Sequence, residues 1–201
     1  MKFDPKLEIE ACPNVYAPAE DTYLLLSAVE IREGQRALEM GCGTGIIALH
    51  CAKAGCRVKA TDISIDAIEN ARMNAAINAL DIDLIHSDLF AKVKGKFDVI
   101  IFNPPYLSVQ DTGGLSDAEK WPLVGGENGH EVSARFLEAA PEHLEPDGKI
   151  YLLTSSESEA GVLGKASQYF SIRKIAEKRI FFETLAAYEL IAAPQTLDPR
   201  P

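Results

Sequence analysis

The sequence has no stretch that marks a membrane-bound or exported protein. No apolar run in its 201 residues reaches the roughly 20 residues that a membrane-spanning helix needs. The start of the chain, Met1-Lys2-Phe3-Asp4, lacks the apolar core of a signal peptide. We therefore expect a soluble cytoplasmic protein with no membrane partner.

Cysteine is sparse, and its spacing does not favour a metal site. The four cysteines, Cys12, Cys42, Cys51 and Cys56, form no CxxC pair and no evident disulfide scheme. We expect them to be reduced residues of the core or of loops, and we expect no bound metal.

Positive charge is in short supply. The chain has 20 Lys and Arg residues against 30 Asp and Glu residues, which gives a net charge of −10. Because proteins bind duplex nucleic acid largely by neutralising its phosphates, this balance disfavours a stable complex with a duplex. It leaves room for a local basic patch.

Strand and helix patterns alternate along most of the chain. The expected strands are residues 36–40, 57–61, 83–86, 97–102, 148–154, 172–182 and 184–193, and the expected helices include residues 22–30, 46–54, 131–143 and 159–169. Asp21 is expected to cap the first helix. Ser64 is expected to cap a further helix, with Ile68, Ala71, Ala75 and Ala79 facing inward.

This order of elements predicts an α/β fold with a single domain spanning residues 1–201. We expect a seven-stranded Rossmann-like doubly wound sheet, mostly parallel, with one antiparallel strand near the C-terminal edge. Residues 107–129 form a long glycine-containing loop, the kind of loop that often acts as a functional lid. Residues 194–201 are expected to be a loose tail.

Asn103-Pro104-Pro105-Tyr106 follows the buried strand 97–102, at the edge where such sheets bind ligands. The two prolines lack N–H groups and stiffen an extended backbone whose carbonyls face outward. The Asn103 side-chain oxygen and a neighbouring carbonyl are two acceptors for a planar NH2 group, such as a carboxamide or an adenine amine, and Tyr106 can stack on it. The alternative interpretation is a strand-ending turn.

Carboxylates follow other strands at the same edge. Glu39 precedes a glycine-rich turn, residues 41–45, whose spacing differs from the dinucleotide fingerprint. A carboxylate there suits an ammonium or sulfonium group, and S-adenosylmethionine carries both. Asp62 is placed to accept hydrogen bonds from ribose hydroxyls, and Asp88 to accept one from an adenine amine. Singly, each carboxylate could be a helix cap or a solvated loop residue, but their order after successive strands favours one binding site.

Together these motifs resemble a known family. Residues 39–45, Asp62 and residues 103–106 resemble the ordered motifs of class I S-adenosylmethionine-dependent methyltransferases that modify amino groups. More narrowly, residues 16–22 and residues 121–131, which include Trp121, resemble the HemK-type glutamine N5-methyltransferases of class-1 translation release factors. The match runs over about residues 14–192. With only about 35 residues before the first strand, we expect no separate helical substrate domain, as in the archaeal and eukaryotic branch.

The resemblance implies a site and a cofactor. Residues 1–35 would include a segment and a helix that cover the cofactor, S-adenosyl-L-methionine. The residues implied to hold it are Thr22, Glu39, Gly41, Gly43, Gly45, Asp62, Asp88 and Asn103, and the implied catalytic residues are Asn103, Pro104, Pro105 and Tyr106. The two acceptors would orient the substrate amide and favour charge build-up on its nitrogen, so no strong base is required.

The main hypothesis is methylation of the glutamine in the Gly-Gly-Gln loop of a class-1 release factor. Alternatives are N6-adenine methylation of DNA or RNA, methylation of another protein or a small molecule, and a cofactor-binding subunit without catalysis. An adenine enzyme needs a basic track, for which the candidates are Lys92, Lys94, Lys96, Arg173, Lys174, Lys178 and Arg179.

The resemblance also implies a partner. Members of the branch often pair with a small zinc-binding activator subunit. Strand 83–86 is expected at the sheet edge, where it could take an added strand from such a subunit.

Overall fold

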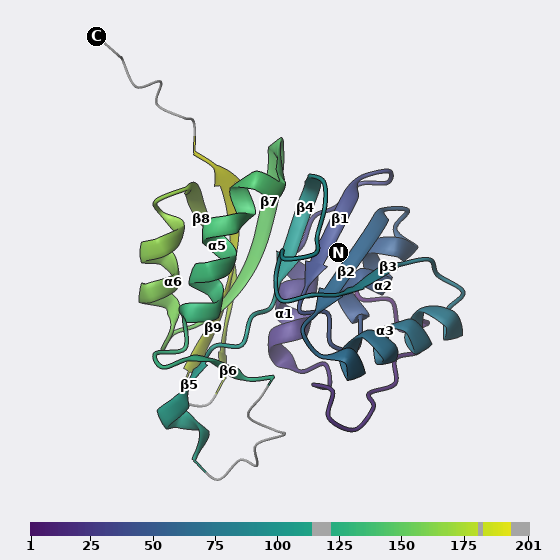
Figure 1. Ribbon diagram of the computed structural model, residues 1–201, viewed down its shortest axis with the longest axis horizontal. Coiled ribbons are helices and arrows are strands. Elements are labelled where there is room, and N and C mark those ends of the chain that lie inside the picture. The colour runs from purple at the N-terminus through teal and green to yellow at the C-terminus, as the bar shows by residue number, and fades with distance from the viewer. Residues whose placement is uncertain (114–121, 181–182, 194–201) are drawn as a thin grey trace.

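A computed structural model of the chain describes residues 1–113, 122–180 and 183–193. Figure 1 shows one twisted sheet with helices packed on both of its faces. The helices are α1 (Glu20–Ala28), α2 (Ile46–Lys53), α3 (Ile65–Ile77), the 3-10 helix η1 (Val109–Thr112), α5 (Glu131–His143) and α6 (Glu159–Ala166). The strands are β1 (Arg36–Met40), β2 (Arg57–Asp62), β3 (Asp83–His86), β4 (Phe97–Phe102), β5 (Leu107–Ser108), β6 (Val124–Gly126), β7 (Leu144–Ser155), β8 (Phe170–Ile180) and β9 (Glu183–Ala192).

The main sheet has seven strands in the order β3-β2-β1-β4-β7-β9-β8. The pairs from β3 to β7 are parallel, whereas β9 is antiparallel to both of its neighbours. Among the described strands of the main sheet, β9 alone therefore runs against the others, which confirms the predicted topology. The predicted edge position of β3 is also confirmed.

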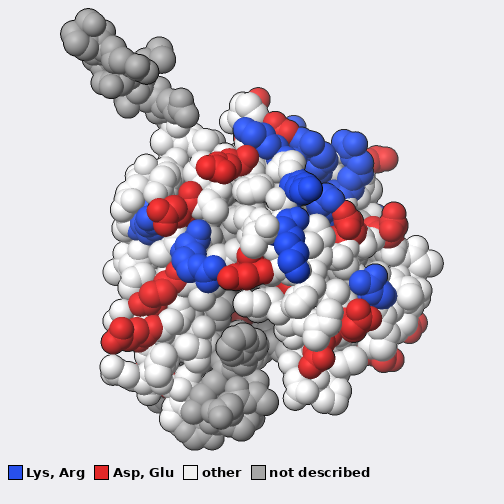
Figure 2. Space-filling view, viewed as in Figure 1, with Lys and Arg blue, Asp and Glu red and all other residues white. Residues whose placement is uncertain are grey.

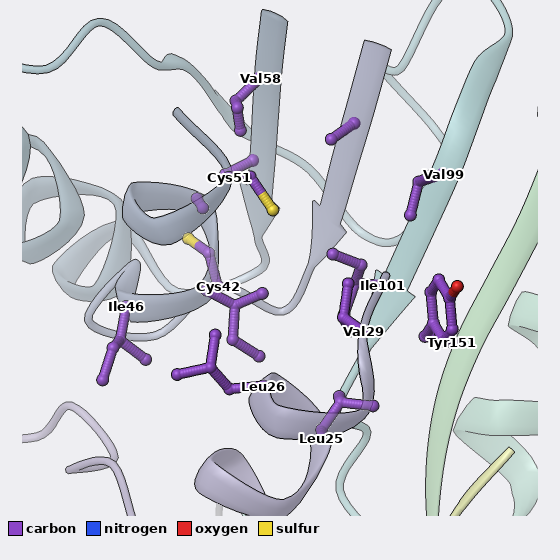
Figure 3. Packing of buried hydrophobic residues seen from close by; sticks show 14 of the residues in the cluster. Leu25, Leu26, Val29, Cys42, Ile46, Cys51, Val58, Val99, Ile101 and Tyr151 are labelled. Atoms are coloured by element: carbon purple, nitrogen blue, oxygen red, sulfur yellow. The ribbon is translucent and has the colours of Figure 1, made fainter. Parts of the chain in front are cut away.

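The core consists of one apolar layer on each face of the sheet. Along β4, Val99 and Ile101 face the layer shared with α1, α2 and α3, whereas Ile100 and Phe102 face the layer shared with α5 and α6. Figure 3 shows Leu25 and Val29 packed toward Ile101 in the first layer. Because β4 is buried on both faces, its whole run is apolar apart from Asp98, as expected for a central parallel strand.

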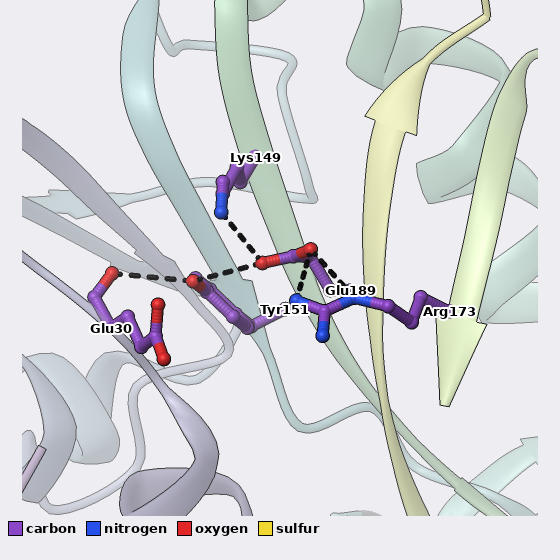
Figure 4. A network of polar contacts seen from close by, with 5 residues as sticks. All are labelled: Glu30, Lys149, Tyr151, Arg173 and Glu189. Carbon is purple, nitrogen blue, oxygen red and sulfur yellow. Dashed lines mark hydrogen bonds and ion pairs between the residues drawn. The ribbon is translucent and has the colours of Figure 1, made fainter. Parts of the chain in front are cut away.

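A buried carboxylate joins the last three strands of the sheet (Figure 4). Glu189 on β9 is only 3% exposed and accepts hydrogen bonds from Lys149 at 2.8 Å and Arg173 at 2.7 Å. Burial alone would raise the pKa of Glu189, but these two cations outweigh it and hold the pKa below its ordinary value. Tyr151 donates to the carbonyl oxygen of Glu30 at 3.3 Å, which links the network to the segment after α1.

Several element boundaries differ from the predictions. Helix α1 begins at Glu20, and Ala19 rather than Asp21 occupies its N-cap position; Asp21 is a buried residue of the first turn. Helix α3 ends at Ile77, so Ala79 lies beyond it, exposed, with φ of 52°. The Ser64 cap is confirmed, since its side chain accepts from the Ala67 N–H at 3.4 Å.

Further differences lie in the second half of the chain. Strand β7 begins at Leu144 rather than residue 148, with a register shift opposite β4, and α6 ends at Ala166 rather than residue 169. The loop 107–129 contains β5, η1 and β6, and β5 pairs with β6. Trp121 and the tail 194–201 lie outside the described residues. No helix in the described part of the chain combines the length and apolarity needed to cross a membrane.

Candidate active site

A cavity of about 720 Å³ opens at the carboxyl ends of β1, β2 and β4. Its lining comes from the N-terminal segment, the glycine-rich turn, the ends of the strands, and α5. The lining includes these predicted site residues: Thr22, Glu39, Gly41, Gly43, Asp62, Asp88, Asn103 and Pro105. Of the other predicted residues, Gly45, Pro104 and Tyr106 do not line this cavity.

The glycine-rich turn depends on backbone conformations that favour glycine. Gly41, Gly43 and Gly45 have φ of 64°, 52° and 78°. A side chain at Gly41 would come within 3.2 Å of the Phe102 ring, and one at Gly45 would come within 3.0 Å of Ala71 on α3. Gly41 and Gly43 therefore leave room for a ligand in the cavity, whereas Gly45 permits α2 to pack closely on α3.

Glu39 is the carboxylate at the centre of the site. Its side chain is buried, and one of its oxygens accepts from the Ala48 N–H in the first turn of α2 at 2.8 Å. Burial is the largest influence and, helped by the negative charge of Asp62, raises the pKa of Glu39 well above its ordinary value despite that hydrogen bond. No cation among the described residues pairs with Glu39, so a positively charged ligand would supply the missing compensation.

Asp62 both lines the cavity and shapes it. Its carboxylate accepts from the Gly43 N–H at 3.0 Å and from the Ser64 N–H at 2.8 Å, which ties the glycine-rich turn to the end of β2. Burial raises the pKa of Asp62, partly offset by these backbone donors. Each carboxylate oxygen has two acceptor sites, so Asp62 keeps capacity for ligand hydroxyls.

Asp88 lies at the outer edge of the cavity, where Arg135 of α5 donates to it at 2.7 Å. Both side chains are largely exposed, at 45% and 59%, so the pair contributes little to stability. Arg135 could not be predicted from the sequence, because nothing in the pattern of α5 distinguishes it from an ordinary solvated residue.

Asn103 leaves an acceptor free inside the site. Its Nδ2 group donates to Asp21 at 2.9 Å, which turns Oδ1 the other way. That oxygen is buried and has no hydrogen-bond partner among the described residues. A buried acceptor without a partner costs about 1–3 kcal/mol, a cost that a ligand N–H donor would remove.

Two tyrosines, Tyr16 and Tyr106, interact with Asp21, the residue to which Asn103 donates. Tyr16 donates to both oxygens of Asp21, each at 3.2 Å, and lines the cavity. Burial first, and then the negative charge of Asp21, raises the pKa of both Tyr16 and Tyr106. Both phenols are therefore neutral hydrogen-bond donors rather than bases at ordinary pH.

Residues 122–131 pack tightly against the Pro105-Tyr106 backbone. A side chain at Gly125 would come within 2.5 Å of the Pro105 carbonyl oxygen, and one at Gly129 would come within 2.4 Å of the Tyr106 carbonyl oxygen. Glu131 closes this turn by accepting from the Asn128 backbone N–H at 3.1 Å. The long loop thus fixes the backbone of the predicted catalytic residues from the outside.

The N-terminal segment is held against α3 by three asparagines that were not predicted as functional residues. Asn70, Asn74 and Asn78, four residues apart on one side of α3, each accept from one backbone N–H and donate to one backbone carbonyl of residues 8–12. Asn74 also donates to the Thr44 carbonyl at 2.9 Å, so it joins this segment to the glycine-rich turn. The four-residue spacing of the asparagines was the feature of the sequence that could have predicted this contact.

Comparison with known proteins identifies the family. The family profile described as methyltransferase small domain matches residues 6–116. A protein of Methanocaldococcus jannaschii named as a protein N5-glutamine methyltransferase is 36% identical over 182 residues, covering 89% of this chain and 92% of that protein. The chain belongs to the family of protein N5-glutamine methyltransferases. The mouse methyltransferase HEMK2 is 39% identical to this methyltransferase over 72% of the chain and 73% of that protein.

Solved structures agree with this assignment. The E. cuniculi Mtq2–Trm112 complex, described as responsible for methylation of the eRF1 translation termination factor, matches with a TM-score of 0.71 and 29% identity. That match covers 90% of this chain and 99% of the other. A methyltransferase from Pyrococcus furiosus matches with a TM-score of 0.72 and 26% identity, over 93% and 90% of the two chains. The predicted Rossmann-like fold and family are thereby confirmed.

S-adenosyl-L-methionine is the cofactor of this methyltransferase family, and the cavity has the properties that it requires. The cavity has room for a nucleoside-sized ligand, with a buried carboxylate lacking a cation and two glycines that allow close approach to the backbone. Among the described residues, no group of three or more His, Cys, Asp or Glu side chains could hold a metal ion.

Proposed function

We propose that this methyltransferase modifies the side-chain amide of the glutamine in the Gly-Gly-Gln loop of a class-1 translation release factor. The observation that carries the proposal is the Oδ1 acceptor of Asn103, which is buried and has no hydrogen-bond partner among the described residues, on a residue that lines the cavity. A primary amide brings the N–H donor that this oxygen lacks. The names of relatives support the choice of glutamine, and the description of a similar solved complex supports the choice of a termination factor.

The cofactor is proposed to lie along the ends of β1, β2 and β4. Glu39 would face its positively charged part, Asp62 its ribose hydroxyls, and Asp88 its adenine amine, with Thr22 and the backbone of Gly41 and Gly43 completing the wall. When bound, S-adenosylmethionine supplies an electrophilic methyl carbon on a positively charged sulfur. The burial of Glu39 strengthens its attraction for a cation, because the pair is screened less than in water.

Asn103 and the Pro104 carbonyl are proposed to hold the substrate NH2 group and Tyr106 to fix the surrounding backbone. An amide nitrogen is a weak nucleophile because its lone pair is delocalised into the carbonyl. Two acceptors on the NH2 group orient the lone pair and stabilise positive charge on nitrogen as the nitrogen–methyl bond forms and the sulfur–methyl bond breaks. The nitrogen then gives up one proton to water, so no side-chain base is needed.

Adenine in a nucleic acid offers a similar NH2 group, but the charges around the cavity disfavour it. Among the described residues that line the cavity, Glu39, Asp62 and Asp88 are acidic and Arg135 alone is basic. Figure 2 shows Lys and Arg gathered along the upper rim of the molecule. Arg36 and Arg57 are the first residues of β1 and β2, at the end of the sheet away from the cavity. A nucleic-acid substrate would require basic residues beside the cavity.

The proposal is tested by incubating the purified protein with methyl-labelled cofactor and either a class-1 release factor or an adenine-containing oligonucleotide. Label is expected in the release factor, and not in a version whose Gly-Gly-Gln glutamine is changed to asparagine. Asn103→Ala is expected to lower the rate by roughly 100- to 1000-fold with little change in cofactor binding. Labelling of the oligonucleotide alone, or full activity of Asn103→Ala, would overturn the proposal.

A small partner subunit, expected to bind zinc, is proposed to add a strand to β3. This strand pairs only with β2 among the described strands, so its outer edge offers free backbone groups. Two large apolar side chains beside it, Ile63 and Ile65, are 49% and 52% exposed. Co-expression with such a subunit should give a stable complex, and Ile63→Asp with Ile65→Asp should dissolve it. If both chains copurify unchanged with these substitutions, the proposed docking place is wrong.

The cytoplasm is the proposed location, where release factors act. The state of the cysteines supports it, because all four are free thiols, three of them buried. Such thiols persist in a reducing compartment.

A further inference from the structure

Asp21 is a buried carboxylate with no established part in the site. It is 3% exposed and lies in the first turn of α1. Its donors among the described residues are all neutral: the Tyr16 hydroxyl, the Thr22 N–H at 2.6 Å, the Thr22 hydroxyl at 3.2 Å, and Asn103 Nδ2 at 2.9 Å, and the Tyr106 hydroxyl also hydrogen-bonds to it. A carboxylate kept this deeply buried without a cation is costly, and such groups concentrate at functional sites.

The contact with Asn103 removes an ambiguity in that side chain. The oxygen and the NH2 group of an asparagine are similar in size, so either could face the cavity. An ionised carboxylate can only accept hydrogen bonds, so it binds the NH2 end and leaves the oxygen pointing away. That oxygen is the buried acceptor without a partner, at the position where the substrate amide is proposed to bind.

We propose that Asp21 is the positioning residue that holds Asn103 as an acceptor and so restricts the substrate to a group with N–H donors. The inference rests on the proposed function and deepens it. If Asn103 turned over, its NH2 group would face the NH2 group of the substrate, and two donors would oppose each other. The charge on Asp21 also polarises the Asn103 amide, which makes Oδ1 a stronger acceptor.

Asp21→Asn tests this role with almost no change of size. An asparagine at this position no longer dictates which end of Asn103 faces the cavity. We expect kcat for glutamine methylation to fall by about 10- to 100-fold, the range for a lost hydrogen bond to a charged group, with cofactor affinity nearly unchanged. Glu20→Gln is the matched control on the same turn, since Glu20 is exposed and pairs with Lys178; its kcat should stay at the wild-type value.

A double-mutant cycle separates positioning from a general structural effect. If Asp21 acts through Asn103, then adding Asp21→Asn to Asn103→Ala should change kcat by no more than about twofold. If instead the reductions in kcat caused by the two substitutions multiply in the double variant, Asp21 acts independently of Asn103 and the proposal is overturned. Wild-type kcat in Asp21→Asn would do the same while leaving the proposed function intact.

A spectroscopic measurement keeps the inference testable even if glutamine is not the substrate. In protein labelled with ¹⁵N-asparagine, the Asn103 side-chain NH2 protons should be shifted downfield by the carboxylate, and Asp21→Asn should remove the shift. Asn103→Ala identifies the signal by its loss, and the Glu20→Gln spectrum should match the wild type. An Asn103 signal that is the same in wild type and in Asp21→Asn would refute the positioning role, whereas absence of methylation by the wild type would refute only the proposed function.

Discussion

At the scale of single residues, Glu39 determines how the site responds to charge. It is a buried carboxylate whose raised pKa shows that the protein alone compensates its charge poorly. A ligand carrying an ammonium and a sulfonium group would compensate the negative charge of Glu39. Asp62, with a raised pKa of its own, is partly compensated by the backbone of the glycine-rich turn. The two carboxylates therefore differ in role. Glu39 lacks a positively charged partner until a ligand binds, whereas Asp62 also stabilises the glycine-rich turn.

Cofactor affinity should depend on pH through Glu39. Below its raised pKa, Glu39 must lose a proton before it can pair with the cofactor, so affinity should fall as the pH falls through that pKa. Glu39→Gln should weaken binding by about 10- to 100-fold and flatten this dependence. Titration calorimetry across pH gives both results. Equal pH dependence in wild type and variant would assign the titration to another group.

At the scale of elements, the prediction succeeded where local pattern decides the structure. Strand β4 and helix α5 were predicted with their observed limits, because continuous apolar runs and three-four spacing suffice there. Local sequence chemistry predicted Asp21 as a helix cap. Its partner Asn103, however, is 82 residues away, and no local rule reveals that contact. The N-terminal segment was likewise missed as a structured element, since its hydrogen bonds go to side chains of α3 rather than to a strand.

The asparagines of α3 fit the segment for a geometric reason. Residues two apart in an extended chain repeat every roughly 6.6 Å, and residues four apart in a helix repeat every roughly 6 Å. Asn74→Ala should remove three hydrogen bonds and leave buried backbone groups unpaired, costing about 1–3 kcal/mol of stability and weakening cofactor binding. Asn78→Ala, at the exposed end, is the control. In thermal unfolding, Asn74→Ala should have a clearly lower unfolding temperature than Asn78→Ala. The reverse order would contradict this explanation.

Strand β6 should be equally intolerant of substitution. Gly125→Ala places a methyl group 2.3 Å from the Gly129 carbonyl oxygen, so the backbone beside Pro105 must move. We expect a loss of activity of at least about tenfold, because a small misplacement of reacting groups is costly. Gly113→Ala, whose added carbon has no atom of the described residues within 4 Å, serves as the comparison and should remain active. Matching activities in steady-state assays would show that this packing does not position the site.

At the scale of the whole molecule, the acidic residues of the cavity, Glu39, Asp62 and Asp88, lie toward the carboxyl ends of the strands, whereas Arg36 and Arg57 begin β1 and β2 at the other end. The acidic groups at the cavity also affect folding. A carboxyl whose folded pKa is raised favours the folded state in its protonated form. Its contribution is full below the unfolded value, 4.5 for Glu39, and is lost as the pH rises through the folded pKa.

Removal of that carboxyl should thus change the stability of the cofactor-free protein in a pH-dependent way. As the pH rises above 4.5, Glu39→Gln should become progressively more stable relative to wild type, up to the raised folded pKa. Added cofactor should reverse the order, because it pairs with the ionised group only in wild type. Differential scanning calorimetry at several pH values, with and without cofactor, measures both. A constant difference between the proteins would indicate that burial of Glu39 is not the cause.

The most direct measurement is a crystal structure of the protein with the demethylated cofactor and a glutamine-containing peptide from a release factor. The account predicts that Asn103 Oδ1 accepts from the glutamine side-chain nitrogen at about 3 Å, while Nδ2 of Asn103 stays on Asp21. It also predicts that this nitrogen faces the sulfur of the cofactor beside Glu39. A glutamine bound elsewhere, or Asn103 with its NH2 group turned into the cavity, would contradict it.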